Sequence, residues 1–313
     1  MIPVDLITGF LGSGKTTFMI AYANYLVNTG LKVGIIENDL GAINVDMLLL
    51  STKLGDRCAL EMITGGGDQV TYQRRLKTKL IALGMQGYDR ILIEPSGIFD
   101  VETFFDVLYE APLDQWYTLG NVIALVDTTL PVDLSKASRY VLASEVACAG
   151  QVVWSHLDKC DASGLMTVQQ YLKQCLMEVS CQRQRPLTMT AKAWQNWSSE
   201  EWDQLMNCGY EMASWIHRTI LPEQVYRSLF FFEFKLDPDM LKARLPALFT
   251  EEKYGRIYRV KGFGQDEKGQ WYQINATARE FEMIAAKHGQ EVLIVIGETL
   301  NEAAIRFHLI GGK

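Results

Sequence analysis

The residues best suited to chemistry lie near the start of the chain, in the segment Gly9-Phe-Leu-Gly-Ser-Gly-Lys-Thr16. This segment fits the pattern GxxxxGK[ST] in full and directly follows an apolar stretch. Its glycines let backbone N–H groups turn toward the α- and β-phosphates of a nucleotide, and the helix that follows adds the positive end of its dipole. We expect Lys15 to reach the β- and γ-phosphates and the Thr16 hydroxyl to bind Mg²⁺. The expected nucleotide-binding residues here are Gly9, Gly12, Ser13, Gly14, Lys15, Thr16 and Thr17.

A second group of polar residues ends the apolar run Arg90–Glu94. An acid at the carboxyl end of a parallel strand lies beside the phosphate loop, at the crevice where open α/β sheets bind ligands. Glu94 is therefore a candidate for the Walker-B role, in which it holds Mg²⁺ through water or polarises the attacking water. The alternative is a surface acid in a turn. Gly97 can present its N–H to the γ-phosphate, so the predicted catalytic residues are Lys15, Glu94 and Gly97.

A third group, Glu37-Asn-Asp39, ends another expected strand at the same edge of the sheet. Polar residues there, followed by Gly41, suit a loop that senses Mg²⁺ or the γ-phosphate and moves on hydrolysis. We expect one of Glu37, Asp39 and Asp46 to act at the metal ion, with helix capping by Asp39 as the alternative. The predicted Mg²⁺ ligands are Thr16, Glu37, Asp39 and Glu94.

The segment Ser155-His-Leu-Asp158 stands where a GTPase carries its Asn-Lys-x-Asp motif. Asp158 is in register to accept hydrogen bonds from N1 and N2 of guanine, a contact that adenine cannot return. Ser155 and His156 replace the Asn and Lys, and we interpret His156 as a packing substitute, with a ligand or catalyst as the alternative. Farther along, Ala191 lies in a segment that resembles the loop whose backbone N–H meets guanine O6. These two matches predict that the nucleotide is GTP.

The elements that must position these residues alternate between strand-like and helix-like patterns, which predicts a parallel sheet with crossover helices. A buried helix is expected over Lys15–Thr29, with Gly30 ending it. The fold class is α/β: a P-loop NTPase with a mostly parallel sheet and helices on both faces, plus a small C-terminal α+β domain. The expected strands of the first domain are Pro3–Thr8, Lys32–Glu37, Arg90–Glu94, Asn121–Asp127, Gln151–Trp154 and Pro186–Thr190.

The pattern changes near residue 220, where an expected aromatic-rich helix ends at Leu221-Pro222. After it, strands separated by Gly turns with few crossover helices indicate a small antiparallel α+β domain. We therefore expect a nucleotide-binding domain over residues 1–222 and a C-terminal domain over residues 227–313. The expected C-terminal elements are strands over Leu229–Phe234, Gly255–Phe263, Gln270–Asn275 and Glu291–Ile296, with helices over Pro238–Leu248 and Thr299–Phe307.

The composition argues against several classes of protein. With 48% hydrophobic and 21% charged residues the chain resembles an ordinary folded protein, and its net charge of −7 argues against a general nucleic-acid binder. No apolar run approaches the roughly 20 residues of a membrane span, and the first residues lack the pattern of a signal peptide. The six cysteines form no CxxC pair, which favours reduced structural thiols. We therefore expect a cytoplasmic protein that binds neither membrane nor nucleic acid.

Together these residues resemble the CobW-like P-loop GTPases, relatives of HypB and UreG, over nearly the whole chain. In the first domain the resemblance rests on the phosphate loop, on Glu37-Asn-Asp-Leu-Gly41 with Asp46, and on Glu94-Pro-Ser-Gly97. In the second domain it rests on the segments 254–262 and 293–304. The resemblance implies slow hydrolysis of GTP, coupled to delivery of a metal or cofactor to a client protein.

The sequence departs from that family at the metal motif. Members carry CxCC preceded by Glu-x-x-Asn-Gly, whereas this chain reads Glu61-Met-Ile-Thr-Gly-Gly-Gly67, without a thiol. Soft thiolate ligation of zinc or cobalt is lost there, and nearby Cys58 alone does not make a four-coordinate site. Delivery of a transition metal in the usual form is therefore doubtful. The Gly triplet is either a loop that changes with nucleotide state or a degenerate loop.

Our leading hypothesis is a GTPase maturation or activation factor whose client is a metallo- or corrinoid enzyme, with a homodimer left open. The alternatives are a nucleotide-sensing adaptor with little hydrolysis and a metal chaperone with non-standard ligands. A small-molecule kinase is a third rival, but we see no convincing Arg-rich lid. A cluster of tryptophans next to the expected capping box Ser198-Ser-Glu-Glu201 is interpreted as packing between the domains or as a client-docking surface. These are Trp194, Trp197, Trp202 and Trp215.

Overall fold

The structure is a computed structural model that describes residues 1–39, 45–64, 69–97, 101–184, 186–187, 189–190, 192–217, 225–232, 237–286 and 289–310. The chain divides into two compact units. The N-terminal unit holds Met1–Ala42 and Asp46–Thr219, and the C-terminal unit holds Ile220–Lys313 together with Ile43–Val45. The predicted boundary at residues 220–227 stays a prediction, because residues 218–224 lie outside the described part.

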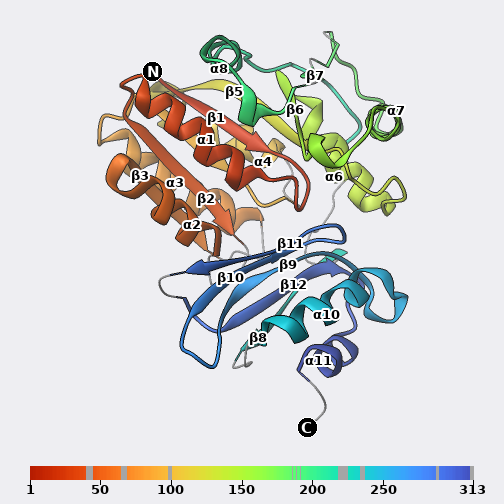
Figure 1. The fold of residues 1–313 in the computed structure, drawn as a ribbon. Helices are drawn as coiled ribbons and strands as arrows, with labels where there is room; N and C mark the ends of the chain where they lie inside the picture. Colours follow the sequence, from red (N-terminus) through yellow and green to blue (C-terminus); the bar gives the residue numbers. More distant parts are fainter. Residues whose placement is uncertain are drawn as a thin grey trace. The chain divides into compact units, whose positions relative to one another are not determined.

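A seven-stranded sheet forms the centre of the N-terminal unit, with the strand order β3-β2-β4-β1-β5-β6-β7 (Figure 1). All neighbouring strands are parallel. Their long apolar runs suit strands that are buried on both faces. The strands are β1 (Ile2–Thr8), β2 (Val33–Asp39), β3 (Cys58–Thr64), β4 (Arg90–Glu94), β5 (Tyr117–Asp127), β6 (Gln151–Ser155) and β7 (Met189–Thr190).

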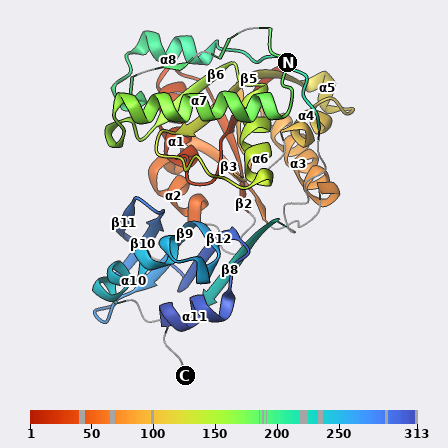
Figure 2. The same ribbon diagram turned by 90° about the vertical axis from the view of Figure 1, so that its right-hand side faces the viewer.

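Helices cover both faces of this sheet (Figures 1 and 2). Leu92 of β4 belongs to the buried cluster that includes Phe18 of α1 and Leu50 of α2. The preceding residue, Ile91, points to the other face, where Leu83 of α3 lies over Gly34. The helices are α1 (Lys15–Asn28), α2 (Val45–Leu54), α3 (Gln69–Gly84), α4 (Glu102–Leu108), α5 (Leu113–Trp116), α6 (Lys136–Ala147), α7 (Ala162–Glu178) and α8 (Ser199–Met206).

The tryptophan-rich segment packs on α1, inside the N-terminal unit. The ring of Trp202 in α8 stacks on Tyr22 and Tyr25 of α1, with centroid distances of 6.1 and 5.6 Å. Trp197 meets Trp202 edge to face at 5.1 Å. The expected capping box is present, because Ser198 and Glu201 each accept a hydrogen bond from the backbone N–H of the other. Together with Trp194, these two tryptophans complete the core around the helix that follows the phosphate loop.

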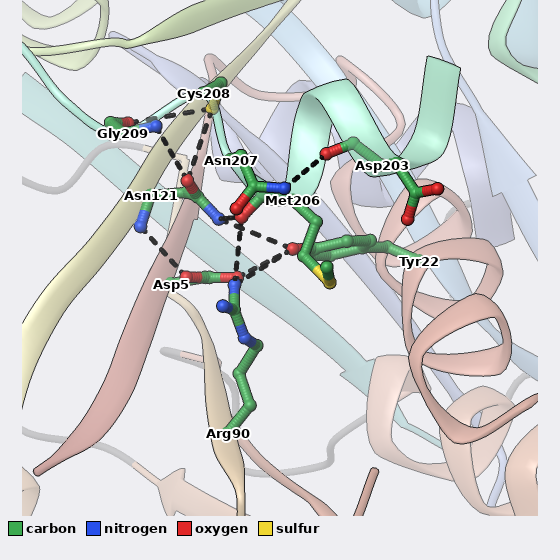
Figure 3. Close-up of polar contacts among 9 residues, drawn as sticks. All are labelled: Asp5, Tyr22, Arg90, Asn121, Asp203, Met206, Asn207, Cys208 and Gly209. Carbon is green, nitrogen blue, oxygen red and sulfur yellow. Dashed lines mark hydrogen bonds and ion pairs between the residues drawn. The ribbon is translucent and has the colours of Figure 1, made fainter. Parts of the chain in front are cut away.

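A buried polar network ties the end of α8 to the sheet (Figure 3). Asp5 of β1, which is fully buried, accepts hydrogen bonds from Arg90 at 2.6 Å and from the Tyr22 hydroxyl at 2.8 Å. Its second oxygen accepts from the backbone N–H of Asn121 at 2.9 Å. The Asn121 carboxamide in turn donates to the carbonyl of Met206 and accepts from the N–H of Gly209. This network holds the segment after α8 against β1, β4 and β5.

The C-terminal unit is a five-stranded antiparallel sheet, ordered β11-β10-β9-β12-β8, with two helices on one side (Figure 1). Its buried cluster joins Leu229 and Phe231 of β8 to Leu245 of α10 and Ile305 of α11. Its elements are β8 (Tyr226–Phe232), α10 (Pro238–Thr250), β9 (Arg256–Gln265), β10 (Trp271–Ala276), β11 (Phe281–Ala286), β12 (Val292–Glu298) and α11 (Glu302–Ile310).

The predicted fold class is confirmed, and three local predictions need correction. Strands β3 and β11 were not expected, since both lie at sheet edges and contain Ala, Glu and Met, which are not typical of strands. The expected helix before residue 221 is wrong over residues 207–217, which form turns and isolated bridges. All six cysteines are free thiols, as expected. Among the described helices, none combines the length and apolar character needed to cross a membrane.

Candidate functional site

The phosphate loop connects β1 to α1, and its glycines have backbone angles that other residues rarely adopt. Gly9, Gly12 and Gly14 have φ values of 144°, 79° and 83°. A Cβ atom on Gly9 would lie 2.3 Å from the carbonyl oxygen of Leu125, so no side chain fits there. Gly14 precedes α1, and no side chain of the described residues caps the helix. The N-terminus of a helix attracts an anion, because its first N–H groups make no hydrogen bond within the helix.

Lys15 and Thr16 open α1, and both side chains are buried. Lys15 Nζ donates a hydrogen bond to the carbonyl oxygen of Gly9 at 2.7 Å, so its ammonium group lies at the phosphate loop. Gly97 follows β4 in close contact with this group, because a Cβ there would lie 2.8 Å from Nζ and 2.9 Å from Leu11 N. The structure thus brings together the three predicted catalytic residues Lys15, Glu94 and Gly97 around the start of α1.

Glu94 contacts α1 directly, since the Thr16 hydroxyl donates to its Oε1 at 2.9 Å. The parallel register of β2 and β4 places Glu37 directly opposite Glu94, and their exposed fractions are only 2% and 5%. Hydroxyl and carboxylate oxygens are the ligands that Mg²⁺ prefers. Three of the four predicted Mg²⁺ ligands, Thr16, Glu37 and Glu94, therefore lie at the same edge of the sheet.

Three buried polar atoms beside these residues have no hydrogen-bond partner among the described residues: Thr8 Oγ1, Ser13 Oγ and Asn38 Oδ1. A buried polar group left without a partner costs about 1–3 kcal/mol, which a bound ligand can offset. Thr8 ends β1, Ser13 lies in the phosphate loop, and Asn38 follows Glu37 in β2. Backbone N–H groups, a lysine and oxygen ligands in one place fit a nucleoside triphosphate with Mg²⁺.

Other predicted residues of this region are described only in part. Asp39 ends β2, but its side chain lies outside the described part of the structure. Asp46 is buried in the first turn of α2, whereas Thr17 is exposed on α1. Gly41 lies outside the described residues. The proposed metal contact of Asp39 or Asp46 therefore stays a prediction.

The predicted base-binding segment follows β6. Ser155 ends that strand and borders the phosphate loop, because a Cβ on Gly14 would lie 3.9 Å from the Cβ of Ser155. His156 has a left-handed backbone with φ of 55°. Asp158 lies in the short 3₁₀ helix Leu157–Lys159, where it is exposed to solvent. Ala191, the other predicted base contact, lies outside the described residues.

Asp127, at the end of β5, is a polar residue of this edge that the sequence interpretation missed. Its Oδ1 lies 3.1 Å from His156 Nδ1 and accepts hydrogen bonds from Thr129. Burial alone would raise the pKa of the Asp127 carboxyl, but the hydrogen bond and charge of His156 and the hydrogen bonds from Thr129 hold this pKa below its usual value. Thr8 was missed as well. Both Asp127 and Thr8 end strands at the same edge as Glu94, and this was the signal that could have identified them.

Cys58 lies at the opposite end of β3 from Thr64, the residue that precedes the segment where the family motif would stand. Cys58 is the first residue of β3, whereas Gly65–Gly67 follow the other end of the strand and lie outside the description. Seven residues of strand span about 20 Å. Burial is the main cause that raises the pKa of the Cys58 thiol, and only a thiolate is a good metal ligand. Within the described residues, no group of three or more His, Cys, Asp or Glu side chains is suited to hold a metal ion.

The fold and this edge of the sheet define a P-loop nucleotide-binding protein. Residues 3–182 match the family model described as CobW/HypB/UreG, nucleotide-binding domain, and residues 228–311 match the cobalamin synthesis protein cobW C-terminal domain. The chain therefore belongs to the CobW/HypB/UreG family, as the resemblance predicted.

Relatives of known name are similar over part of their length. The zinc chaperone YjiA of Escherichia coli is 33% identical over 176 residues, which cover 52% of this chain and 51% of that protein. The zinc-regulated GTPase metalloprotein activator 1 of Dictyostelium discoideum is 32% identical over 146 residues, 40% of this chain and 30% of that protein. The matched region thus spans about half or less of these relatives. The crystal structure of Zn(II)-bound YjiA GTPase aligns with a TM-score of 0.41 and 18% identity, covering 100% of this chain and 99% of that one.

Proposed function

We propose that the protein binds GTP with Mg²⁺ and hydrolyses it slowly, and that this cycle serves the maturation or activation of a client protein. The observation that carries the proposal is the contact of Thr16 with Glu94 beside the phosphate loop, with Glu37 in register with Glu94. The relatives named as a zinc chaperone and a GTPase metalloprotein activator support a role in metal handling. A metallo- or corrinoid enzyme is the proposed client class.

In this proposal each residue has a role that follows from its position. The N–H groups of the phosphate loop and Lys15 Nζ hold the phosphates, and Thr16 with Glu37 and Glu94 would hold Mg²⁺. When bound, this ion supplies positive charge that offsets the charge on the phosphate oxygens. Glu94 orients a water molecule, and the N–H of Gly97 donates to the γ-phosphate. Water then displaces GDP from the γ-phosphorus, which gives GDP and inorganic phosphate.

Guanine is selected by the exposed carboxylate of Asp158, which we propose accepts from N1 and N2 of the base, with the Ala191 N–H donating to O6. A charged acceptor contributes about 1.5–3 kcal/mol per hydrogen bond, and adenine presents no matching donors at these positions. The segment that follows β2 is the proposed sensor of the nucleotide state. A homodimer is compatible with this function and stays a proposal.

The proposal is tested with purified protein and Mg²⁺ by measuring phosphate release from GTP and ATP. We expect turnover of GTP but little of ATP, and Asp158→Ala should reduce the preference for GTP by roughly tenfold or more. Asp114→Ala is the matched control. Asp114 is also an exposed aspartate, but it lies in α5, just before the start of β5, whereas the proposed site follows the other end of the strands. If ATP is hydrolysed as well as GTP and Asp158→Ala changes neither, the guanine assignment fails.

A metal chaperone with non-standard ligands is the second candidate, because relatives carry that name. Equilibrium dialysis against zinc, cobalt and nickel, with and without GTP, separates the two candidates. Tight binding of one equivalent of metal would favour the chaperone. Absence of tight binding in both nucleotide states would leave the activation factor. In a third outcome, a client binds the Glu94→Gln variant with the same affinity as the wild type, while the wild type itself shows little turnover. This pair of results would instead indicate a nucleotide-sensing adaptor.

A further inference from the structure

The loops that follow β5 and β6 are joined by hydrogen bonds that the predicted function does not explain. Asp127 lies directly opposite Ser155 in the register of the two strands. The Thr128 hydroxyl lies 2.9 and 2.8 Å from the carbonyl oxygens of Ser155 and His156, and its one proton is shared between these two acceptors. The Thr128 N–H also donates to the Ser155 carbonyl at 3.1 Å. The loop after β5 therefore fixes the backbone at both Ser155 and His156.

The ring of His156 is held from the same loop. Its Nδ1 lies 3.1 Å from Asp127 Oδ1, and that oxygen is itself fixed by the N–H and hydroxyl of Thr129, each at 2.7 Å. His156 has a left-handed backbone, which a residue with a Cβ keeps only when its surroundings impose it. A carboxylate that is bonded to one ring nitrogen fixes the orientation of an imidazole. Asp127 and Thr128 thus contribute to fixing the position of this ring.

His156 lies between two residues of the proposed nucleotide site. Ser155, which precedes it, borders Gly14 of the phosphate loop, and the exposed Asp158 follows two residues after it. The His156 side chain retains 22% exposure, so part of the ring still faces solvent. Aromatic side chains stack on the flat faces of bases, and this contact does not depend on which base is present.

We propose that the His156 ring is a stacking surface for the nucleotide base and that Asp127 is the residue that positions it. This inference rests on the proposed nucleotide-binding function and assigns separate roles to two residues of the base site. Asp158 selects guanine, whereas His156 strengthens the binding of any purine nucleotide equally. The phosphates are held independently by the phosphate loop.

The test compares three ligands, GDP, ADP and inorganic tripolyphosphate, by calorimetric titration with Mg²⁺. His156→Gly removes the ring at a position whose backbone glycine adopts readily, so the fold should be retained. We expect this variant to bind GDP and ADP roughly 5- to 100-fold more weakly by the same factor, with tripolyphosphate binding unchanged within about twofold. Asp127→Ala should weaken both nucleotides less, and the double variant should be no worse than His156→Gly alone, since Asp127 acts through the ring.

Ser180→Gly is the matched control, because Ser180 also has a left-handed backbone, with φ of 50°, at the exposed end of α7. It should change no affinity. An equal loss of tripolyphosphate binding in His156→Gly would indicate a structural effect and overturn the proposal. GDP affinity that is the same in His156→Gly as in the wild type would also overturn it. If the wild type binds GDP no better than ADP, the guanine assignment fails, a result distinct from the other two because this inference requires only that both nucleotides lose affinity by the same factor.

Discussion

Glu37 of β2 lies directly opposite Glu94 of β4, and both carboxylates are almost fully buried. Two like charges on neighbouring strands repel each other unless a cation or a proton separates them. Thr16, the second residue of α1, contacts Glu94 from the phosphate loop side. The arrangement is therefore suited to a divalent cation that arrives with a nucleotide.

Replacement of Glu94 by Gln should slow GTP hydrolysis on the order of 100-fold while GTP still binds. The Gln side chain keeps an oxygen that can accept from Thr16, so the change removes charge and leaves size almost unchanged. The measurement is single-turnover phosphate release over a Mg²⁺ titration, in which more Mg²⁺ should be needed. Glu110→Gln is the control, because Glu110 forms only an exposed ion pair with Lys77. Normal turnover by Glu94→Gln would contradict the role given to this carboxylate.

Gly97→Ala should weaken both binding and hydrolysis of GTP through steric contact alone. Its Cβ would lie 2.8 Å from Lys15 Nζ and 2.9 Å from Leu11 N, closer than carbon and nitrogen atoms pack. One of the two segments must shift, and a shift of the phosphate-binding lysine costs affinity. Titration with a fluorescent GTP analogue should show a dissociation constant at least several-fold higher, with the melting temperature nearly unchanged. Wild-type affinity would mean that Gly97 lies farther from the phosphates than we propose.

Asp5→Ala should destabilise the N-terminal unit by about 3–5 kcal/mol, because it leaves Arg90 without its buried partner. The loss corresponds to a fall in melting temperature of roughly 6–20 °C for a domain of this size. The exposed Lys77–Glu110 pair provides the comparison, since Glu110→Ala should cost less than about 1 kcal/mol. Calorimetric melting of the three proteins measures both effects. Similar melting temperatures for Asp5→Ala and Glu110→Ala would show that the network in Figure 3 contributes little.

The phosphate loop and Glu94 could be predicted because a motif of fixed spacing lies between an apolar strand and a helix. The sequence identified Thr16 and Glu94 separately, but their contact depends on β1 and β4 being neighbours, which no local pattern records. Asp127 was missed for the same reason: its partner His156 comes from the next strand of the sheet.

Strand β3 was missed for a different reason. Its sequence Cys-Ala-Leu-Glu-Met-Ile-Thr has a weak preference for strands, and its pairing with β2 decides its conformation. The segment around Trp215 shows the reverse error. That segment was expected to belong to a helix, yet its backbone makes isolated bridges at Tyr210 and Ser214. In both cases, backbone pairing with a distant part of the chain overrides the local pattern.

Trp202→Ala should destabilise the protein by about 2–4 kcal/mol, somewhat below the cost for a fully buried tryptophan because this one is only partly buried. The variant removes a ring that stacks on both Tyr22 and Tyr25 of α1. Met166→Ala on the exposed face of α7 is the control and should change stability by less than about 0.5 kcal/mol. Urea unfolding measures both. A stable Trp202→Ala protein that has lost only client binding would favour the docking interpretation of this segment.

The Asp127 carboxyl should make a pH-dependent contribution to stability on the acid side. Its pKa in the folded protein lies below the usual value, because the contacts with His156 and Thr129 outweigh the effect of burial. A lowered folded pKa means that the unfolded chain takes up a proton first as the pH falls. The stabilisation is therefore complete above the unfolded pKa of about 3.9 and is lost as the pH falls through the folded pKa. Urea unfolding of wild type and Asp127→Asn between about pH 7 and pH 3 should give a constant difference at the higher pH values that shrinks below about pH 4. The exposed Asp114→Asn variant should follow the wild type throughout, and a difference for Asp127→Asn that grows on acidification would reverse the sign we assign.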